Sequence, residues 1–162
     1  MKHSYLLLLI ALLSILTISC KHKRSGKPKV LIFSKTSGFR HSSISVGKLA
    51  IMKLGGQNNF DVDTTENAAW FNDDTLKKYS AVIFLSTTEN VLDYRQEAAF
   101  ERYIQAGGGF MGIHAATDTE YDWGWYVRLV GASFVSHPEQ QEAKLLVVDK
   151  SNIATNIYPI PG

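Results

Sequence analysis

The chain has 162 residues, of which 45% are hydrophobic and 20% charged, a composition typical of one globular domain with enough residues to bury a core. Its formal net charge is +2, but from Val30 onward there are 11 Lys and Arg against 15 Asp and Glu, a net charge of −4. We therefore expect no nucleic-acid partner, because nucleic acids are bound by basic surfaces.

The first 20 residues have the pattern of an export signal. A short basic start precedes the uncharged, Leu-rich run Leu6–Ile18, whose 13 residues are few for a membrane span and typical of a signal-peptide core. The run ends in Thr-Ile-Ser-Cys, which resembles a bacterial lipobox with Thr17 in place of the usual leucine.

Cys20 is the only cysteine, so the chain cannot form an internal disulfide. We expect Cys20 to be lipidated and to become the mature N-terminus, with residues 21–28 as a basic tether. The protein would then be an exported bacterial membrane lipoprotein whose domain faces the periplasm or the cell exterior. The alternative is an ordinary secretory signal with an incidental cysteine.

Residues 29–162 predict one domain in which strands and helices alternate. Short apolar runs predict buried strands, and apolar residues at helical spacing predict helices between them. Asn72 is placed to cap one helix, Gly55 and Gly56 to end the helix before it, and Gly107 to end the longest one. In chain order, the predicted elements are strand 29–33, helix 42–54, strand 60–64, helix 72–78, strand 81–85, helix 92–106, strand 110–113, helix 125–130 and strand 143–148. This alternation predicts an α/β fold with a parallel sheet and helices on both faces.

Polar segments follow three of the predicted strands. They are SKTSGFRHSS after Phe33, STTEN after Leu85 and HAATDTEYDW after Ile113. Ligands of open parallel sheets bind beyond the carboxyl ends of the strands. We therefore expect the three segments to form one site.

The segment after the fourth strand contains the leading catalytic candidates. His114 is the first residue past the strand and is suited to a general acid/base or a metal ligand; the alternative is a histidine that bonds nearby backbone and holds the loop. Asp118 and Glu120 are two carboxylates that can divide acid and base roles or hold sugar hydroxyls. The alternative is a pair of solvated acids, with Asp118 capping a turn.

The segment after the first strand contributes His41, a further catalytic candidate, and Arg40, which is suited to an anionic group. Ser42 or Ser43 is expected to cap the helix that follows, whose N-terminus favours an anion. The alternative for these residues is helix-entry chemistry alone. His137 brings the loop histidines of the body to three, the number in an open zinc site. No HxxxH pair is present; we predict no metal and no cofactor, with a divalent metal such as zinc as the less favoured alternative.

Four aromatic residues, Tyr121, Trp123, Trp125 and Tyr126, form a dense cluster near the same segment. Flat rings with polar tips suit the apolar face of a pyranose, whereas the alternative is packing into the core. The chain contains no phosphate-binding GxxxxGK[ST], no GxGxxG after the first strand and no CxxC, so nucleotide-binding and dithiol functions have no support.

Three stretches carry a resemblance to a known family: VLIFSKTSGFRHSSI, VIFLSTTENVLD and GGGFMGIHAATDTEYDWGWYVRLVGASFVSHP. In order and spacing they resemble the ThuA-like, trehalose-utilisation family over about Val30–Val148. The residues that match its motifs are Gly38, Phe39, His41, Ser42, His114, Asp118, His137 and Pro138. The resemblance implies a class I glutamine amidotransferase-like fold, which is a flavodoxin-like three-layer sandwich with a mostly parallel central sheet.

The chain departs from the patterns of its relatives in several places. Amidotransferases have a catalytic cysteine at the sharp turn after a strand, but Gly112–Ala116 stands there without one, which excludes thiol-dependent amidotransferase chemistry. Glu89 stands where the family often has glycine, and Gly124 where proline is frequent. Family members usually continue past this point, so we expect the ThuA-like domain at 29–162 to be incomplete at its C-terminus.

The resemblance implies utilisation of a trehalose-like disaccharide or a keto-sugar, with a small-molecule carbohydrate as partner. His114, Asp118 and His41 would supply acid–base chemistry of a hydrolase, lyase or isomerase type. The candidate substrate-binding residues are Phe39, Arg40, Ser42, Thr87, Glu120, Tyr121, Trp123 and His137. The competing hypothesis is a non-catalytic carbohydrate-binding or scaffold module anchored at the membrane.

Overall fold

The computed structural model describes residues 26–156 of the chain. The predicted signal peptide, Cys20 and most of the predicted tether lie outside the described residues, as does the end of the chain from residue 157. Among residues 26–156, no helix combines the length and the apolar character needed to cross a membrane.

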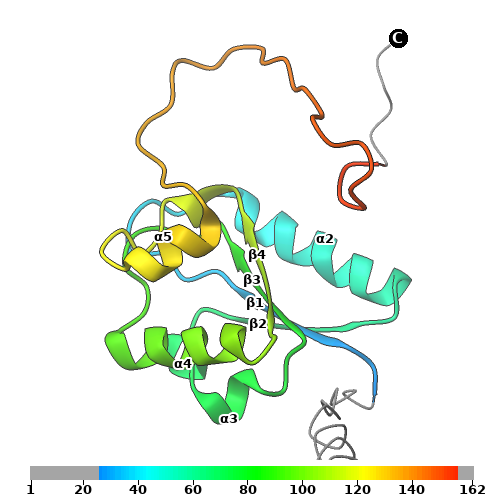
Figure 1. Cartoon of the computed structure of the whole chain (residues 1–162), viewed down its shortest axis with the longest axis vertical. Coiled ribbons are helices and arrows are strands. Elements are labelled where there is room, and N and C mark those ends of the chain that lie inside the picture. Colours follow the sequence, from blue (N-terminus) through cyan, green and yellow to red (C-terminus); the bar gives the residue numbers. More distant parts are fainter. Residues whose placement is uncertain (1–25, 157–162) are drawn as a thin grey trace, which may run out of the picture.

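A parallel sheet lies at the centre of the fold (Figure 1). Its strands are β1 Lys29–Phe33, β2 Asp61–Thr65, β3 Ala81–Leu85 and β4 Gly109–Ile113. They lie in the order β2-β1-β3-β4, and each neighbouring pair is parallel. Phe33 pairs with Thr65 and Phe84, and Leu85 pairs with Ile113, so the carboxyl ends of the strands meet at one edge. The predicted α/β fold is confirmed, and it is consistent with a flavodoxin-like sandwich.

Helices cover both faces of the sheet. In chain order they are α2 Ser43–Gln57, the 3-10 turn η1 Ala68–Trp70, α3 Asp73–Leu76, α4 Tyr94–Gln105, the 3-10 turn η2 His114–Thr117 and α5 Gly124–Val130. Figure 1 shows α2 on one side of the sheet, and α3, α4 and α5 on the other. Because side chains alternate along a strand, Ile32 and Ile83 join Ile51 of α2 in one core cluster, while their neighbours join Phe100 and Tyr126 in a larger cluster on the opposite face.

Phe84 of β3 is the centre of the larger cluster and is fully buried. Its ring centroid lies 5.3 to 5.7 Å from the rings of Phe33, Phe71, Phe100, Phe110 and Tyr126. The pairs are edge-on, tilted or stacked, arrangements in which aromatic rings attract one another beyond their burial. Phe84 thereby joins three strands of the sheet to α4 and α5.

Replacement of Phe84 by alanine therefore removes the shared partner of this aromatic cluster. We expect Phe84→Ala to lower the free energy of unfolding by about 3–5 kcal/mol, measured by urea denaturation. Met111→Ala is the control, because the Met111 side chain on the edge strand β4 is 54% exposed and its loss should cost no more than about 1 kcal/mol. Equal losses in the two variants would contradict the central place of Phe84.

The predicted end of α2 at Gly55 and Gly56 is wrong, because the helix continues through both glycines to Gln57. Gly55 is buried, and a Cβ there would lie 2.8 Å from the carbonyl oxygen of Phe60 and 2.9 Å from a methyl group of Val62. The glycine thus allows the chain that returns into β2 to pass close to the helix.

The caps of the helices decide several other boundaries. The Asn72 side chain accepts a hydrogen bond from the Thr75 amide at 2.9 Å and caps α3, as predicted. Asp93 caps α4 in a capping box with Gln96, so the helix begins two residues later than predicted. The serine cap expected for α2 is wrong: Ser42 already has helical backbone angles, and its side chain accepts no cap hydrogen bond. The predicted bounds of β1 and β3 match the structure, and the remaining boundaries shift by no more than two residues.

The predicted strand 143–148 is also wrong, because these residues form no ladder with the described part of the sheet. After α5 the chain arches away from the sheet (Figure 1). Leu145, Leu146 and Val148 are 80–93% exposed. Apolar residues favour a strand only where a sheet edge is beside them, and the path of the chain beyond α5 does not bring them to one.

Candidate functional site

The loops that follow β1, β3 and β4 are joined to one another beyond the ends of the strands. An isolated parallel bridge pairs Thr36 with Thr88, and another pairs Glu89 with Thr119. The Glu89 amide donates to the carbonyl of Asp118 at 2.6 Å. These contacts continue the parallel pairing of the strands into the loops, although in a shifted register. The three polar segments therefore meet at one edge of the sheet.

His114 is the first residue of the 3-10 turn η2, at the sharp turn that follows β4. Its φ of +55° lies in the left-handed region, which is costly for a residue with a side chain. The turn folds residue 116 back over residue 112, where a Cβ on Gly112 would lie 3.0 Å from the Ala116 methyl group. Small residues on both sides therefore allow the turn to form, as at the elbows that expose a catalytic side chain after a strand.

A cavity of about 1030 Å³ lies at this edge of the sheet. Its walls include His41 and Phe39 from the loop after β1, His114 and Asp118 from the loop after β4, and His137. The rest of its lining consists of Ala115, Thr117, Phe134, Pro138, Glu139, Gln140, Gln141, Glu142 and Ala143. The cavity thus brings together the three predicted catalytic residues and two of the predicted substrate-binding residues.

Two histidines from distant parts of the chain are in direct contact in this cavity. The ring centroids of His41 and His114 lie 4.5 Å apart, nearly perpendicular to each other. The Phe39 ring also contacts His41, with ring centroids 4.8 Å apart. The two imidazoles can therefore act on the same bound molecule.

Asp118 is held by the phenol of Tyr121. The Tyr121 hydroxyl donates a hydrogen bond to Asp118 Oδ1 and also lies 3.0 Å from the carbonyl oxygen of Phe134. Partial burial and this hydrogen bond raise the pKa of Tyr121 to about 12, so the phenol stays protonated as a donor. Tyr121 thus orients the carboxylate that lines the cavity.

Two predicted binding residues are buried and do not line the cavity. Glu120 is 1% exposed, and its Oε1 accepts hydrogen bonds from the amides of Val91 and Leu92 at 2.9 and 2.8 Å. Burial is the main cause that raises the pKa of Glu120. Thr87 is fully buried and shares a 2.8 Å hydrogen bond with the hydroxyl of Thr119. Both residues connect the loop after β3 to the loop after β4.

The predicted cluster of Tyr121, Trp123, Trp125 and Tyr126 packs mainly into the core. Trp123 stacks on Trp125 with centroids 5.0 Å apart and on Tyr126 at 5.9 Å, and all three pack against the larger core cluster. The structure therefore does not bring Trp123 to the cavity. Ser42 is exposed and does not line the cavity either.

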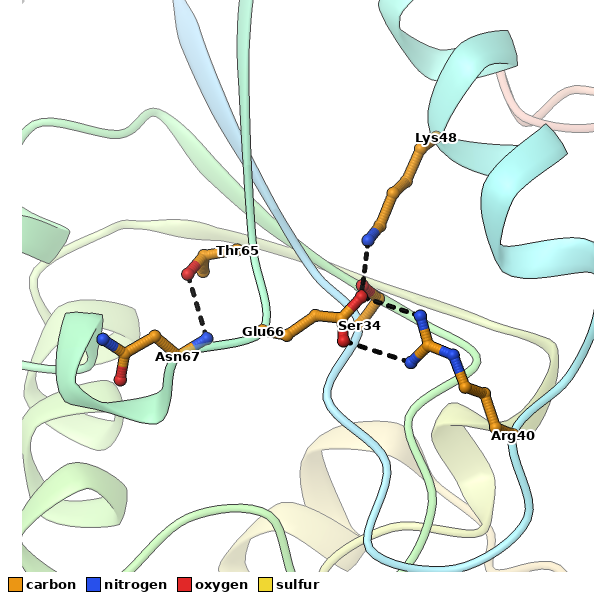
Figure 2. A network of polar contacts seen from close by, with 6 residues as sticks. All are labelled: Ser34, Arg40, Lys48, Thr65, Glu66 and Asn67. Atoms are coloured by element: carbon orange, nitrogen blue, oxygen red, sulfur yellow. Dashed lines mark hydrogen bonds and ion pairs between the residues drawn. The ribbon is translucent and has the colours of Figure 1, made fainter.

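Arg40 is directed to Glu66, a residue that the sequence analysis did not single out. The guanidinium Nη1 and Nη2 donate to Glu66 Oε2 and Oε1 at 3.1 and 2.8 Å, and Lys48 Nζ donates to Oε1 at 2.8 Å (Figure 2). The hydrogen bonds of Arg40, followed by those of Lys48, lower the pKa of Glu66 to about 2. Its position in the sequence could have indicated a role at the site, because Glu66 directly follows β2 at the edge where the other loops meet.

Within the described residues 26–156, no group of three or more His, Cys, Asp or Glu side chains is arranged to hold a metal ion. The contact between His41 and His114 brings two imidazoles together, but no third ligand completes such a group with them in this part of the chain.

Comparison with known proteins decides the family. The sequence model of the ThuA family, described as trehalose utilisation, matches residues 29–160. The chain belongs to the ThuA family. A crystal structure of a protein described as ThuA-like from Bacteroides uniformis has the same fold, with a TM-score of 0.65 and 24% identity. The match covers 87% of this chain and 59% of that one. No curated protein sequence matches at a significant level.

The two departures from the ThuA pattern fall at positions where backbone geometry matters. Glu89 has a φ of +58°, a conformation that glycine adopts more easily, and its carboxylate lies over Gly38, where a Cβ would be 2.6 Å from Oε1. Gly124 is the first residue of α5, the helical position at which proline is favoured. Neither departure removes a group that lines the cavity.

A comparison of two substitutions measures the strain at His114. His114→Ala and His114→Gly both remove the imidazole, but only glycine adopts a φ of +55° freely. We expect the glycine variant to be more stable than the alanine variant by about 1 kcal/mol, measured by urea denaturation. A glycine variant that is less stable than the alanine variant would show that the turn is not strained.

The pKa of Glu66 provides a test of its bond to Arg40. Because the pKa is lowered in the folded state, the stabilisation it represents is complete above pH 4.5 and is lost as the pH falls through about 2. We expect Arg40→Gln to raise the pKa of Glu66 toward 4.5, measured from its carboxyl ¹³C shift by NMR. An unchanged titration midpoint in Arg40→Gln would show that Arg40 does not cause the low pKa.

Proposed function

We propose that this ThuA-family protein processes a trehalose-like disaccharide or its keto-sugar form, with His114, His41 and Asp118 as proton-transfer groups. The observation that supports this proposal is the 4.5 Å contact between two imidazoles in a cavity that Asp118 also lines. Imidazole is the side chain best suited to exchange protons near neutral pH. Two adjacent imidazoles can supply a proton acceptor and a proton donor to one substrate.

The chemistry that fits such a pair is proton removal beside a carbonyl group. In a keto-disaccharide, one imidazole takes the proton from the carbon between the carbonyl and the anomeric carbon. The C–H electron pair forms a C=C bond, the glycosidic C–O bond breaks, and the other imidazole gives its proton to the leaving oxygen. No oxidant or reductant is consumed. Asp118, held by Tyr121, would orient an imidazole or accept a hydrogen bond from a sugar hydroxyl.

A non-catalytic carbohydrate-binding module is the second candidate function. It is favoured by Phe39, whose ring lines the cavity and is 70% exposed, as expected of a platform for the apolar face of a sugar. The two functions differ in their dependence on the imidazoles. Only the enzyme needs His114 to transfer a proton.

We further propose that the domain acts outside the cytoplasm. The proposal rests on the export signal pattern at the N-terminus and on Cys20 in the lipobox-like sequence. A lipid on Cys20 would hold the domain at a bacterial membrane, facing the periplasm or the cell exterior.

Thermal melting of the wild type and His114→Ala, with trehalose and with 3-ketotrehalose, tests the function. A sugar at 100 times its Kd stabilises the native state by about 2.7 kcal/mol and raises the melting temperature. For an enzyme we expect 3-ketotrehalose to shift both proteins and only the wild type to cleave it, with products followed by chromatography.

Equal shifts without cleavage by either protein would favour the binding module. If neither sugar shifts the wild type, the proposed substrate class is wrong. Asp73→Asn is a suitable control for cleavage, because Asp73 lies in α3 and does not line the cavity.

A further inference from the structure

His41 is flanked along the chain by two cations that converge on one carboxylate. Arg40 immediately precedes it, and Lys48 lies in α2, the helix that begins two residues after it. Both side chains donate hydrogen bonds to Glu66, with three nitrogen–oxygen distances between 2.8 and 3.1 Å (Figure 2). Glu66 therefore connects the end of β2 to the chain on both sides of His41.

Glu66 projects from a turn that is itself well fixed. Thr65, the last residue of β2, is 8% exposed, and its carbonyl accepts a hydrogen bond from the Ser34 amide at 3.2 Å. Its hydroxyl accepts a hydrogen bond from the Asn67 amide at 3.0 Å. Figure 2 shows Thr65 and Asn67 bonded to each other on one side of Glu66, with the Ser34 hydroxyl beside the carboxylate. The carboxylate is thus a fixed point against which the loop after β1 is held.

The loop has a second anchor on its other side. The Thr88 hydroxyl donates to the carbonyl of Phe39 at 3.0 Å, and the Ser37 amide donates to the carbonyl of Thr88 at 3.0 Å. These bonds attach the residues before His41 to the loop after β3. The described residues form no hydrogen bond with the His41 ring itself, so its place depends on the backbone that carries it and on its ring contacts.

We propose that Glu66 is a positioning residue that holds the His41 imidazole against His114 through Arg40 and Lys48. Arg40, whose guanidinium is occupied on both Nη atoms, then serves the site by placing its neighbour rather than by binding an anion. The Arg40 and Glu66 side chains are 49% and 42% exposed, and exposed ion pairs of this kind add little to global stability. The bonds of Glu66 to Arg40 and Lys48 therefore act mainly on the position of the loop after β1. The role in catalysis rests on the proposed function, but the geometric role does not.

The test compares Glu66→Gln with Asp73→Asn in the full chain. Asp73 is a matched control because its carboxylate also binds an arginine in a fork, with Arg102 Nε and Nη2 at 3.0 and 2.9 Å, and it lies in α3 on the opposite face of the sheet from α2. The readout is the nuclear Overhauser effect between the ring protons of His41 and His114. We expect the effect to disappear in Glu66→Gln and to persist in Asp73→Asn, with similar, small changes in melting temperature.

Persistence of the ring contact in Glu66→Gln would overturn the proposal, and so would its loss in both variants. Arg40→Lys keeps the positive charge but not the two-pronged geometry, so it should weaken the ring contact, and it replaces Glu66→Gln if that variant does not fold. With 3-ketotrehalose as the probe, we expect kcat to fall at least about tenfold in Glu66→Gln, because displacement of a catalytic group lowers the rate steeply. If no sugar is a substrate, the proposed function fails while the ring contact still tests Glu66.

Discussion

The pairing of the loops beyond the strand ends is the constraint on which the rest of the site depends. Parallel strands bring their carboxyl ends to one edge, and the bridges from Thr36 to Thr88 and from Glu89 to Thr119 continue the parallel pairing into the loops in a shifted register. Each loop therefore has little freedom to move relative to its neighbours. His41 and His114, which are far apart in the sequence, meet because their loops are fixed to the same central segment.

This arrangement has an energetic cost that the core has to offset. Non-glycine residues with positive φ in the described chain are concentrated in the loops after β3 and β4: Ser86, Glu89, His114 and Glu120. Left-handed backbone costs such residues roughly 1–2 kcal/mol each. The larger core cluster, with Phe84 at its centre, lies directly before these loops. The apolar surface buried in it stabilises the fold by enough to offset this cost. Strained backbone commonly gathers at functional sites, where the well-packed structure around it holds it in place.

The sequence alone predicted the parts of the structure that depend on local pattern. The α/β alternation, the Asn72 cap and the meeting of three polar loops at one edge follow from periodicity and turn chemistry, and the structure confirms them. Of these three loops, only those after β1 and β4 line the cavity. The end of α2 was missed because Gly55 serves the close passage of β2, and the strand at 143–148 was missed because its apolar residues have no sheet edge beside them. Glu66 was missed because its role depends on contacts with Arg40 and Lys48, which are distant in the sequence. Only the fold brings these residues together.

The interlocked loops also bear on how the cavity can change by mutation. A substitution in one loop alters the backbone that supports the other two, so effects on ligand preference should be strongly non-additive. Single changes that would suit a new ligand are then masked unless a compensating change occurs in a partner loop. Substitutions that change the cavity are easier to accommodate in the exposed chain after α5, which lines one wall without joining the bridges. Redesign of specificity in this fold is best begun from that wall, with the three paired loops treated as a single inherited unit.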